Sequence, residues 1–211
     1  MIPNEKEWYD ALLQRHGEDT QKKFSEAKVV ICGLGGLGSN VAVSLARTGV
    51  GHICLIDFDR VDISNLNRQQ YFPGQLGLPK AQALRKTLEM IAPYCKFTSV
   101  EVKLTDENIP TLLKDYDVIC EAFDRADQKA MLVNCVLEKF PEKFLVSGNG
   151  MAGLGSSNEI TTKRVTKRFY ICGDGKSDVN DGLGLVSARV ALCAAHEANM
   201  ILRIIAGEYD A

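Results

Sequence analysis

Short apolar runs alternate along the chain with longer segments in which apolar residues recur at helical spacing. A strand that is buried on both faces reads as a continuous apolar run. The runs predict strands at residues 28–32, 52–57, 96–104, 117–123 and 143–150. The longer segments predict helices at residues 37–49, 80–94, 106–115, 125–140 and 186–207. This alternation favours an α/β fold with a doubly wound, mostly parallel, Rossmann-like sheet.

The pattern becomes less regular between residues 151 and 181. Alternation within residues 159–175, EITTKRVTKRFYICGDG, predicts a few additional C-terminal strands, which we expect outside the central sheet. Another irregular stretch, residues 58–79, is polar and rich in Asn and Arg; loops of that length in compact domains are usually functional or disordered. Because no repeat or linker interrupts the chain, residues 1–211 are expected to form one domain.

Composition and charge restrict the possible partners. The chain is 45% hydrophobic and 25% charged, and its formal net charge of −2 gives no global reason to bind nucleic acid or an anionic membrane. No apolar run approaches the roughly 20 residues that span a bilayer. The polar N-terminus of mixed charge does not resemble a secretory signal. We therefore expect a cytoplasmic protein with no nucleic-acid or membrane partner.

The seven cysteines include no C-x-x-C pair. Their odd number argues against a disulfide framework, and the missing pairs argue against a structural zinc site. Cys172 is the one cysteine that the pattern places in a flexible, glycine-flanked segment. A thiolate stabilised by the nearby Lys167, Arg168 and Lys176 would be reactive, but a cysteine that simply ends a strand is the favoured interpretation.

The stretch KVVICGLGGLGSN contains Gly33, Gly35 and Gly38 in the spacing G-x-G-x-x-G, directly after a predicted strand. In this context the first glycine permits a tight turn, the second lets a phosphate approach the backbone, and the third allows close helix packing. Asp57 ends the next strand, where a carboxylate binds ribose hydroxyls. The arrangement predicts a nucleotide site, but it fits NAD, FAD and ATP equally well.

The segment DFDRVDISNLNRQ, residues 57–69, narrows this choice. Arg68 can bind phosphate oxygens in bidentate fashion, and Lys80 at the start of the next helix adds a second positive charge. Asp124, just past the strand at 117–123, can hold Mg²⁺ against phosphates. These three residues favour chemistry at phosphorus over hydride transfer. The simpler alternatives are a surface salt bridge for Arg68 and a solvated helix start for Lys80.

Four motifs together resemble the ThiF/MoeB/HesA family, the bacterial relatives of ubiquitin-activating enzymes: GLGGLGSN, DFDRVDISNLNRQ, GLPK ending at Lys80, and EAFDRAD containing Asp124. The short length and the segments GMAGLGSSNEI and AAHEAN are most similar to the compact ThiF-type branch of thiamine biosynthesis. The resemblance implies an adenylyltransferase that binds ATP, Mg²⁺ and the C-terminal Gly-Gly tail of a small β-grasp sulfur-carrier protein. The tail carboxylate would attack the α-phosphorus, forming an acyl-adenylate and releasing pyrophosphate.

The resemblance also implies a role for each motif residue. The residues expected along the nucleotide are Gly33, Gly35, Gly36 and Gly38 at the phosphates, Asp57 at the ribose, and Ser64, Asn65, Arg68 and Gln69 along the triphosphate. Lys80 would stabilise charge at the α-phosphate, and Asp124 would bind or position Mg²⁺, so that Arg68, Lys80 and Asp124 form the catalytic set. The family is usually homodimeric, with an N-terminal arginine in the partner's site; Arg15 is the nearest candidate.

Many members of the family hold zinc on two C-x-x-C pairs, which this chain lacks, so no zinc is expected. The basic residues Lys163, Arg164, Lys167 and Arg168 could steer an acidic carrier or protect an exposed strand edge. The alternative functions are a non-catalytic nucleotide-binding module, adenylation of a tRNA carboxylate by the same fold, and, least favoured, an NAD-dependent oxidoreductase.

Overall fold

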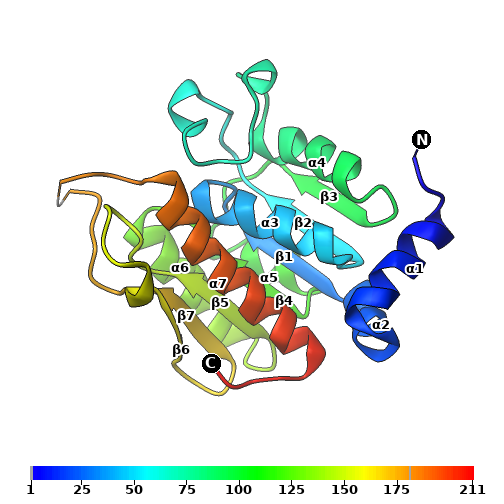
Figure 1. Cartoon of the computed structure of the whole chain (residues 1–211). Coiled ribbons are helices and arrows are strands. Elements are labelled where there is room, and N and C mark those ends of the chain that lie inside the picture. Colours follow the sequence, from blue (N-terminus) through cyan, green and yellow to red (C-terminus); the bar gives the residue numbers. More distant parts are fainter. Residues whose placement is uncertain (1, 181) are drawn as a thin grey trace.

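A seven-stranded sheet forms the centre of the protein in the computed structural model, which describes residues 2–180 and 182–211 (Figure 1). In spatial order the strands are β3 (Lys96–Val100), β2 (His52–Ile56), β1 (Lys28–Cys32), β4 (Val118–Glu121), β5 (Phe144–Gly148), β7 (Phe169–Gly173) and β6 (Thr161–Arg164). All neighbouring pairs are parallel except β6 and β7, which are antiparallel. This confirms the predicted doubly wound, mostly parallel sheet.

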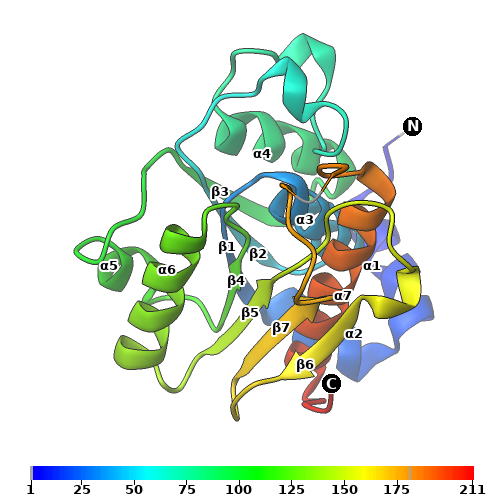
Figure 2. The ribbon, with the colours of Figure 1, turned by 90° about the vertical axis from the view of Figure 1, so that its left-hand side faces the viewer.

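Helices cover both faces of the sheet, as Figure 2 shows. One face carries α3 (Gly36–Thr48), α4 (Lys80–Ile91) and α7 (Ser187–Ala206), and the other carries α5 (Ile109–Leu113) and α6 (Ala126–Lys139). Successive residues of a strand point to opposite faces. Val29 and Ile31 of β1 therefore join the core under α3 and α7, whereas Val30 and Cys32 join the core under α6.

The expectation that residues 159–175 form strands outside the central sheet is wrong. β7 pairs in parallel with β5 through Leu145 and Phe169, and β6 then pairs with β7, so both strands extend the same sheet. The physical reason lies in the apolar character of β7, where Phe169, Tyr170 and Cys172 are buried. A strand buried on its faces requires the cover that a central sheet and α7 provide.

Several predicted elements are longer than the observed ones. The strands predicted at 96–104 and 117–123 are confined to β3 and β4, and the helices predicted at 80–94 and 106–115 are confined to α4 and α5. None of the helices in the described residues combines the length and apolar character that crossing a membrane requires.

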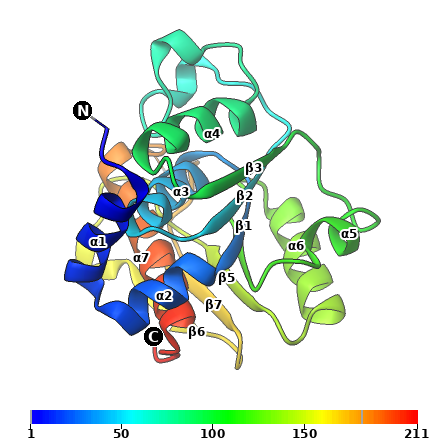
Figure 3. The same cartoon turned by 90° about the vertical axis from the view of Figure 1, so that its right-hand side faces the viewer.

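Two N-terminal helices, α1 (Glu5–His16) and α2 (Glu18–Glu26), were not predicted from the sequence. Helix α2 packs against α7, and α1 packs against α2 (Figure 3). The available signal was a capping box: the Asn4 side chain accepts the Glu7 N–H over 3.0 Å, and the Glu7 carboxylate accepts the Asn4 N–H over 2.9 Å.

Helix α7 carries a carboxyl group into the core. Glu197 is fully buried, and neither of its oxygens has a hydrogen-bond partner among the described residues. Burial raises the pKa of Glu197 well above its ordinary value; Lys129 opposes that increase and Glu121 adds to it. The folded protein therefore favours the protonated, neutral acid at this position.

Glu197 is expected to make stability depend on pH. Between the ordinary pKa of about 4.5 and the raised folded-state pKa, the folded chain holds a proton that the unfolded chain releases. The free energy of unfolding then falls as pH rises, by at most about 1.4 kcal/mol per pH unit. Glu197→Gln, a neutral replacement, should flatten this slope in urea unfolding at pH 5.5 and 8, whereas Glu208→Gln at the exposed C-terminus should keep it. An unchanged slope in Glu197→Gln would contradict the assignment.

Candidate nucleotide-binding site

The glycine loop between β1 and α3 has the shape that its spacing predicts. Gly33 turns the chain with φ of +91°, and a Cβ there would lie 2.9 Å from the Ala122 carbonyl oxygen. A Cβ at Gly38 would lie 1.9 Å from the Gly33 carbonyl oxygen, so helix and loop pack in direct contact. Next to Gly35, by contrast, the Gln69 amide nitrogen at 3.9 Å is the one neighbour within 4 Å of a Cβ position among the described residues. The loop therefore leaves its backbone open at Gly35.

The N-terminus of α3 opens onto this loop without a capping side chain. Gly35 precedes the helix and makes no side-chain cap hydrogen bond. The first N–H groups of a helix, together with its dipole, favour an anion at that end. Two other segments pack closely against Gly36. A Cβ at this position would lie 2.8 Å from the Val190 side chain of α7 and 3.6 Å from the Arg68 side chain.

Asp57 holds the glycine loop through a hydrogen bond from the loop backbone to its buried carboxylate. Its carboxylate, 7% exposed, accepts the Leu34 N–H over 2.7 Å and the Asp59 N–H over 2.7 Å. Burial raises the pKa of Asp57, and the Asp59 N–H and the charge of Lys80 oppose that increase. Sequence reasoning assigned Asp57 to a ribose and missed this structural use. The ribose contact itself stays a prediction.

Arg68 and Gln69 bring unpartnered polar atoms to the loop. Arg68 Nη1 donates to the Ser64 carbonyl over 3.0 Å and to Asn67 Oδ1 over 2.7 Å, but its buried Nε has no partner within the described residues. The buried Oε1 of Gln69 also lacks a partner there. Buried polar groups are normally satisfied. An unpartnered donor next to Gly36 and an unpartnered acceptor next to Gly35 fit the phosphates and hydroxyls of a nucleotide.

Ser64 and Asn65 build the turn that presents Arg68. Asp62 accepts the Ser64 N–H over 2.9 Å and the Ser64 hydroxyl over 2.6 Å. Asn65 Oδ1 accepts the Asp62 N–H over 3.0 Å, which closes a short 3₁₀ turn, η1 (Ile63–Asn65). The side chains of Ser64 and Asn65 therefore already make hydrogen bonds within their own loop. Their predicted contact with a triphosphate stays a prediction.

Lys80 is held in place at the start of α4. Its side chain is only 8% exposed, and Nζ lies 3.1 Å from Asp59 Oδ2, whose side chain is 51% exposed. The backbone is fixed as well, since the Lys80 N–H donates to the Asp59 carbonyl over 2.9 Å. A buried ammonium group with one exposed carboxylate partner can exchange that partner for a phosphate. Asp59 was not identified from the sequence, although it lies within the quoted motif.

Asp124 is exposed in the turn that follows β4. Ala122, two residues earlier, contacts Gly33, so this turn borders the glycine loop. The described residues include no group of three or more His, Cys, Asp and Glu side chains able to hold a metal ion. Mg²⁺ is commonly bound by one or two carboxylates together with substrate phosphates and water. Asp124 fits that mode, with the nucleotide supplying the other ligands.

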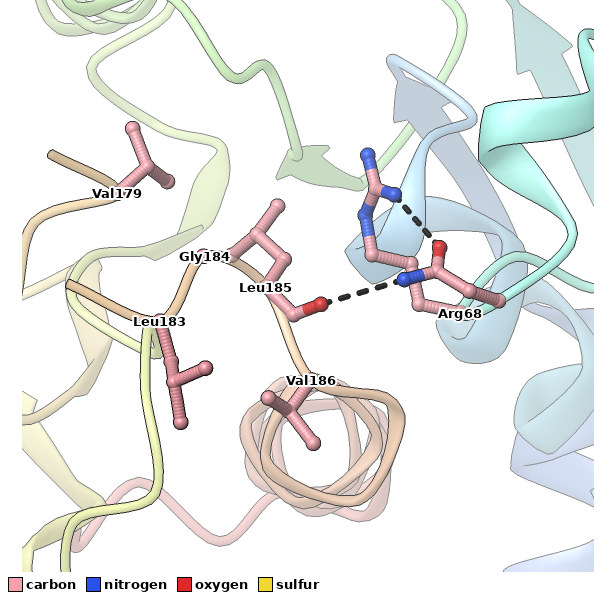
Figure 4. Close-up of a pocket in the computed structure, with 7 residues that line it drawn as sticks. Arg68, Val179, Leu183, Gly184, Leu185 and Val186 are labelled. Atoms are coloured by element: carbon pink, nitrogen blue, oxygen red, sulfur yellow. Dashed lines mark hydrogen bonds between the residues drawn. The ribbon is translucent and has the colours of Figure 1, made fainter.

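A cavity of about 500 Å³ lies beside Arg68. Figure 4 shows Arg68 on one side and the segment before α7 on the other. Asn67 Nδ2 donates to the Leu185 carbonyl over 3.4 Å and joins the two sides. Leu183, Leu185 and Val186 give this side of the cavity an apolar character.

The structure does not support a reactive Cys172. The residue is fully buried near the end of β7, and burial raises its pKa to about 12. The prediction of a flexible setting is wrong, and the simpler interpretation of a cysteine ending a strand is confirmed. The other cysteines are also buried, except Cys95, which is partly exposed.

Arg15 and the basic cluster lie away from the glycine loop. Arg15 is exposed on α1, whose Trp8 and Leu12 pack against Gly49 at the opposite end of α3. In the cluster, the Arg164 guanidinium lies 5.6 Å from the centre of the Tyr170 ring, and the Arg168 guanidinium lies 4.6 Å from that of Phe144. Lys163 and Arg164 lie on the edge strand β6, and Lys167 and Arg168 lie in the turn between β6 and β7. Their part in steering a carrier stays a prediction.

Solved structures share this fold at low sequence identity. The structure of E. coli tRNA N6-threonylcarbamoyladenosine dehydratase in complex with ATP superposes with a TM-score of 0.85, at 23% identity over 97% of both chains. The structure of E. coli MccB with AMPCPP and MccA gives a TM-score of 0.72, at 21% identity over 99% of this chain and 67% of that one. At these identities the agreement shows the fold.

Curated relatives share about a third of their aligned residues with this chain. The E. coli K12 tRNA threonylcarbamoyladenosine dehydratase is 34% identical over 72% of this chain and 57% of its own length. The Haemophilus influenzae molybdopterin-synthase adenylyltransferase is 34% identical over 72% and 62%. The Thermus thermophilus sulfur carrier protein adenylyltransferase is 34% identical over 64% and 45%. The chain thus spans less than two thirds of the length of each of these relatives.

The family assignment covers nearly the whole chain. The pattern that defines the ThiF family matches residues 9–210, which include the glycine loop, the segment around Arg68, Lys80 and the turn with Asp124. The predicted resemblance is therefore confirmed on the residues that carried it. The protein belongs to the ThiF family.

Proposed function

We propose that the protein is an adenylyltransferase that uses ATP to activate a carboxylate. The observation that carries the proposal is a pair of unpartnered polar atoms at the start of α3: Arg68 Nε, whose side chain lies next to Gly36, and Gln69 Oε1, whose amide lies next to Gly35. These atoms would contact a nucleotide at the N-terminus of α3, where the helix dipole favours phosphates. Relatives named as adenylyltransferases, and ATP in a structure of the same fold, support the proposal.

The reaction needs positioning and charge neutralisation more than acid–base catalysis. A carboxylate oxygen of the substrate forms a bond to the α-phosphorus, and the bond from that phosphorus to the bridging oxygen breaks. Pyrophosphate leaves with the bonding electrons, and an acyl-adenylate remains. A carboxylate is a weak nucleophile, so the rate depends on alignment and on fixed positive charges.

Each residue would supply one part of this arrangement. The backbone from Gly33 to Gly38 would accommodate the phosphates, and Arg68 would bind their oxygens. Lys80, already fixed beside Asp59, would exchange that carboxylate for the α-phosphate and stabilise the charge that develops there. Asp124 would hold Mg²⁺, which supplies charge neutralisation for the phosphates. Asp57 would contribute to the ribose while it supports the loop.

The preferred substrate is the Gly-Gly C-terminus of a small β-grasp sulfur-carrier protein in thiamine biosynthesis. The relative named as a sulfur carrier protein adenylyltransferase supports the carrier class. The thiamine assignment depends on the resemblance to the compact ThiF-type branch. The same proposal includes a cytoplasmic location and a homodimer. Arg15 is remote from the glycine loop of its own chain, so in such a dimer it would reach the nucleotide of the partner.

Adenylation of a tRNA carboxylate is the second candidate. A relative and a solved structure of the same fold are both named as tRNA threonylcarbamoyladenosine dehydratases. The shared site would activate either carboxylate by the same chemistry. The net charge of −2 gives the tRNA substrate no support, since tRNA binding depends on positive charge.

Exchange of labelled pyrophosphate into ATP tests the proposal. With Mg²⁺ and a purified carrier ending in Gly-Gly, exchange should require the carrier and should fall about 10²-fold in Arg68→Ala. Parallel reactions contain threonylcarbamoylated tRNA, or a carrier from molybdopterin synthesis in place of one from thiamine synthesis. Exchange with tRNA alone would select the second candidate. ATP binding without exchange in any reaction would leave a nucleotide-binding module.

A further inference from the structure

A buried ionic cluster lies directly behind the turn that carries Asp124. Its centre is Glu121, the last residue of β4, whose side chain is fully buried. Lys129 of α6 places Nζ 2.9 Å and 3.1 Å from the two carboxylate oxygens. Ser147 of β5 donates its hydroxyl to the same carboxylate over 2.5 Å. Three elements of the fold therefore converge on one carboxylate at the sheet edge where the nucleotide site lies.

The same carboxylate also fixes the turn itself. Glu121 Oε1 accepts the N–H of Phe123 over 2.7 Å, and Phe123 immediately precedes Asp124. On the other side, the Ala122 carbonyl oxygen lies against Gly33. Asp124 thus extends from a backbone that is attached to α6 through Lys129 and to the glycine loop through Ala122.

Stability alone does not explain a charged group at this position. A buried ion pair is often no more stabilising than apolar side chains of the same volume. A charged cluster does, however, hold directional contacts that apolar packing cannot. We propose that Glu121, Lys129 and Ser147 are positioning residues that hold Asp124 at the glycine loop for a magnesium-bound nucleotide. The inference rests on the proposed role of Asp124, since each of the three residues would act through it.

Calorimetric binding of ATP at increasing Mg²⁺ concentration, and in EDTA, tests this role. Lys129→Met should raise the Mg²⁺ concentration for half-maximal tight binding by about tenfold, since supporting partners of metal ligands typically contribute 10–100-fold. Metal-free ATP binding should stay within about twofold of the original, because Arg68 and the glycine loop are untouched. Lys129→Arg, which keeps the cation, should restore most of the Mg²⁺ response.

Two controls separate positioning from general damage. Lys139→Met removes an exposed lysine of the same helix and should change nothing. In an Asp124→Asn background, Lys129→Met should cause no further shift, because the residue it positions has already lost its charge. If Lys129→Met does not fold, Ser147→Ala keeps the ion pair and should give a smaller shift in the same direction.

The possible outcomes distinguish this inference from the proposed function. An unchanged Mg²⁺ requirement in folded Lys129→Met, or equal losses of ATP binding with and without Mg²⁺, would overturn the positioning role. Binding requires no carboxylate substrate, so it can be measured whatever the substrate is. Absence of pyrophosphate exchange, with the Mg²⁺ response of ATP binding intact, would overturn the adenylation proposal alone.

Discussion

Lys80→Ala is expected to reduce carrier-dependent pyrophosphate exchange by about 10²–10³-fold, which is typical of losing one preorganised group at a developing charge. Lys80 is held beside Asp59 with its Nζ at 3.1 Å and most of its stem buried. Its ammonium group is therefore held at a fixed place before a nucleotide binds, and the exposed Asp59 carboxylate is the group that a phosphate has to displace. Initial exchange rates at saturating ATP and carrier measure the effect.

A matched variant shows whether the loss belongs to the site. Lys86→Ala removes an exposed lysine from the same helix and should leave exchange within about twofold of the original. Asp59→Asn keeps Lys80 but removes its partner, so it should weaken exchange less than Lys80→Ala does. Equal rates for Lys80→Ala and the original protein would remove Lys80 from the catalytic set.

Arg189→Ala is expected to lower the free energy of unfolding by about 3–5 kcal/mol, the usual result of leaving a buried charge unpaired. Arg189 Nη2 lies 2.5 Å from Asp174 Oδ2, and both side chains are almost completely buried. Arg189 Nη1 also donates to the Ser156 carbonyl over 2.9 Å. One side chain of α7 therefore anchors both the loop before β6, through Ser156, and the loop after β7, through Asp174. Urea unfolding measures the free energy, and limited proteolysis should show earlier cleavage between residues 150 and 180.

The same helix provides the control for this prediction. Arg203 pairs with Glu208 over 2.8 Å in an exposed setting, so Arg203→Ala should change the free energy of unfolding by at most about 1 kcal/mol. Replacing both partners, as Arg189→Met with Asp174→Asn, should recover part of the lost stability because no buried charge is left alone. Similar losses in Arg189→Ala and Arg203→Ala would show that burial of the pair has no special effect.

The sequence predicted those parts of the fold that depend on neighbouring residues. The apolar runs gave the core strands β1, β2, β4 and β5, because a buried strand needs a continuous run whatever its neighbours are. The position of β7 could not be inferred in this way. Alternation within residues 159–175 fits a separate hairpin or an extension of the sheet, and the choice depends on contacts with β5 and α7 that no local pattern records.

In the candidate site, too, residues within linear motifs could be predicted, whereas partners distant in sequence could not. Arg68, Lys80 and Asp124 were identified because they lie in linear motifs. Asp59 and Lys80, 21 positions apart, are joined only by the path of the loop between β2 and α4. Glu121 and Ser147 meet only because β4 and β5 pair in that register. Partners of this kind become visible once the strand order is known.

The buried cysteines have a consequence for the chemical handling of the protein. Burial raises the pKa of all seven thiols, so native molecules carry almost no thiolate for alkylating agents or peroxide. Only Cys95 is partly exposed, and its pKa is raised to about 11. Thiol labelling would therefore record global opening, and the folded chain would age slowly in air while its unfolded fraction oxidised.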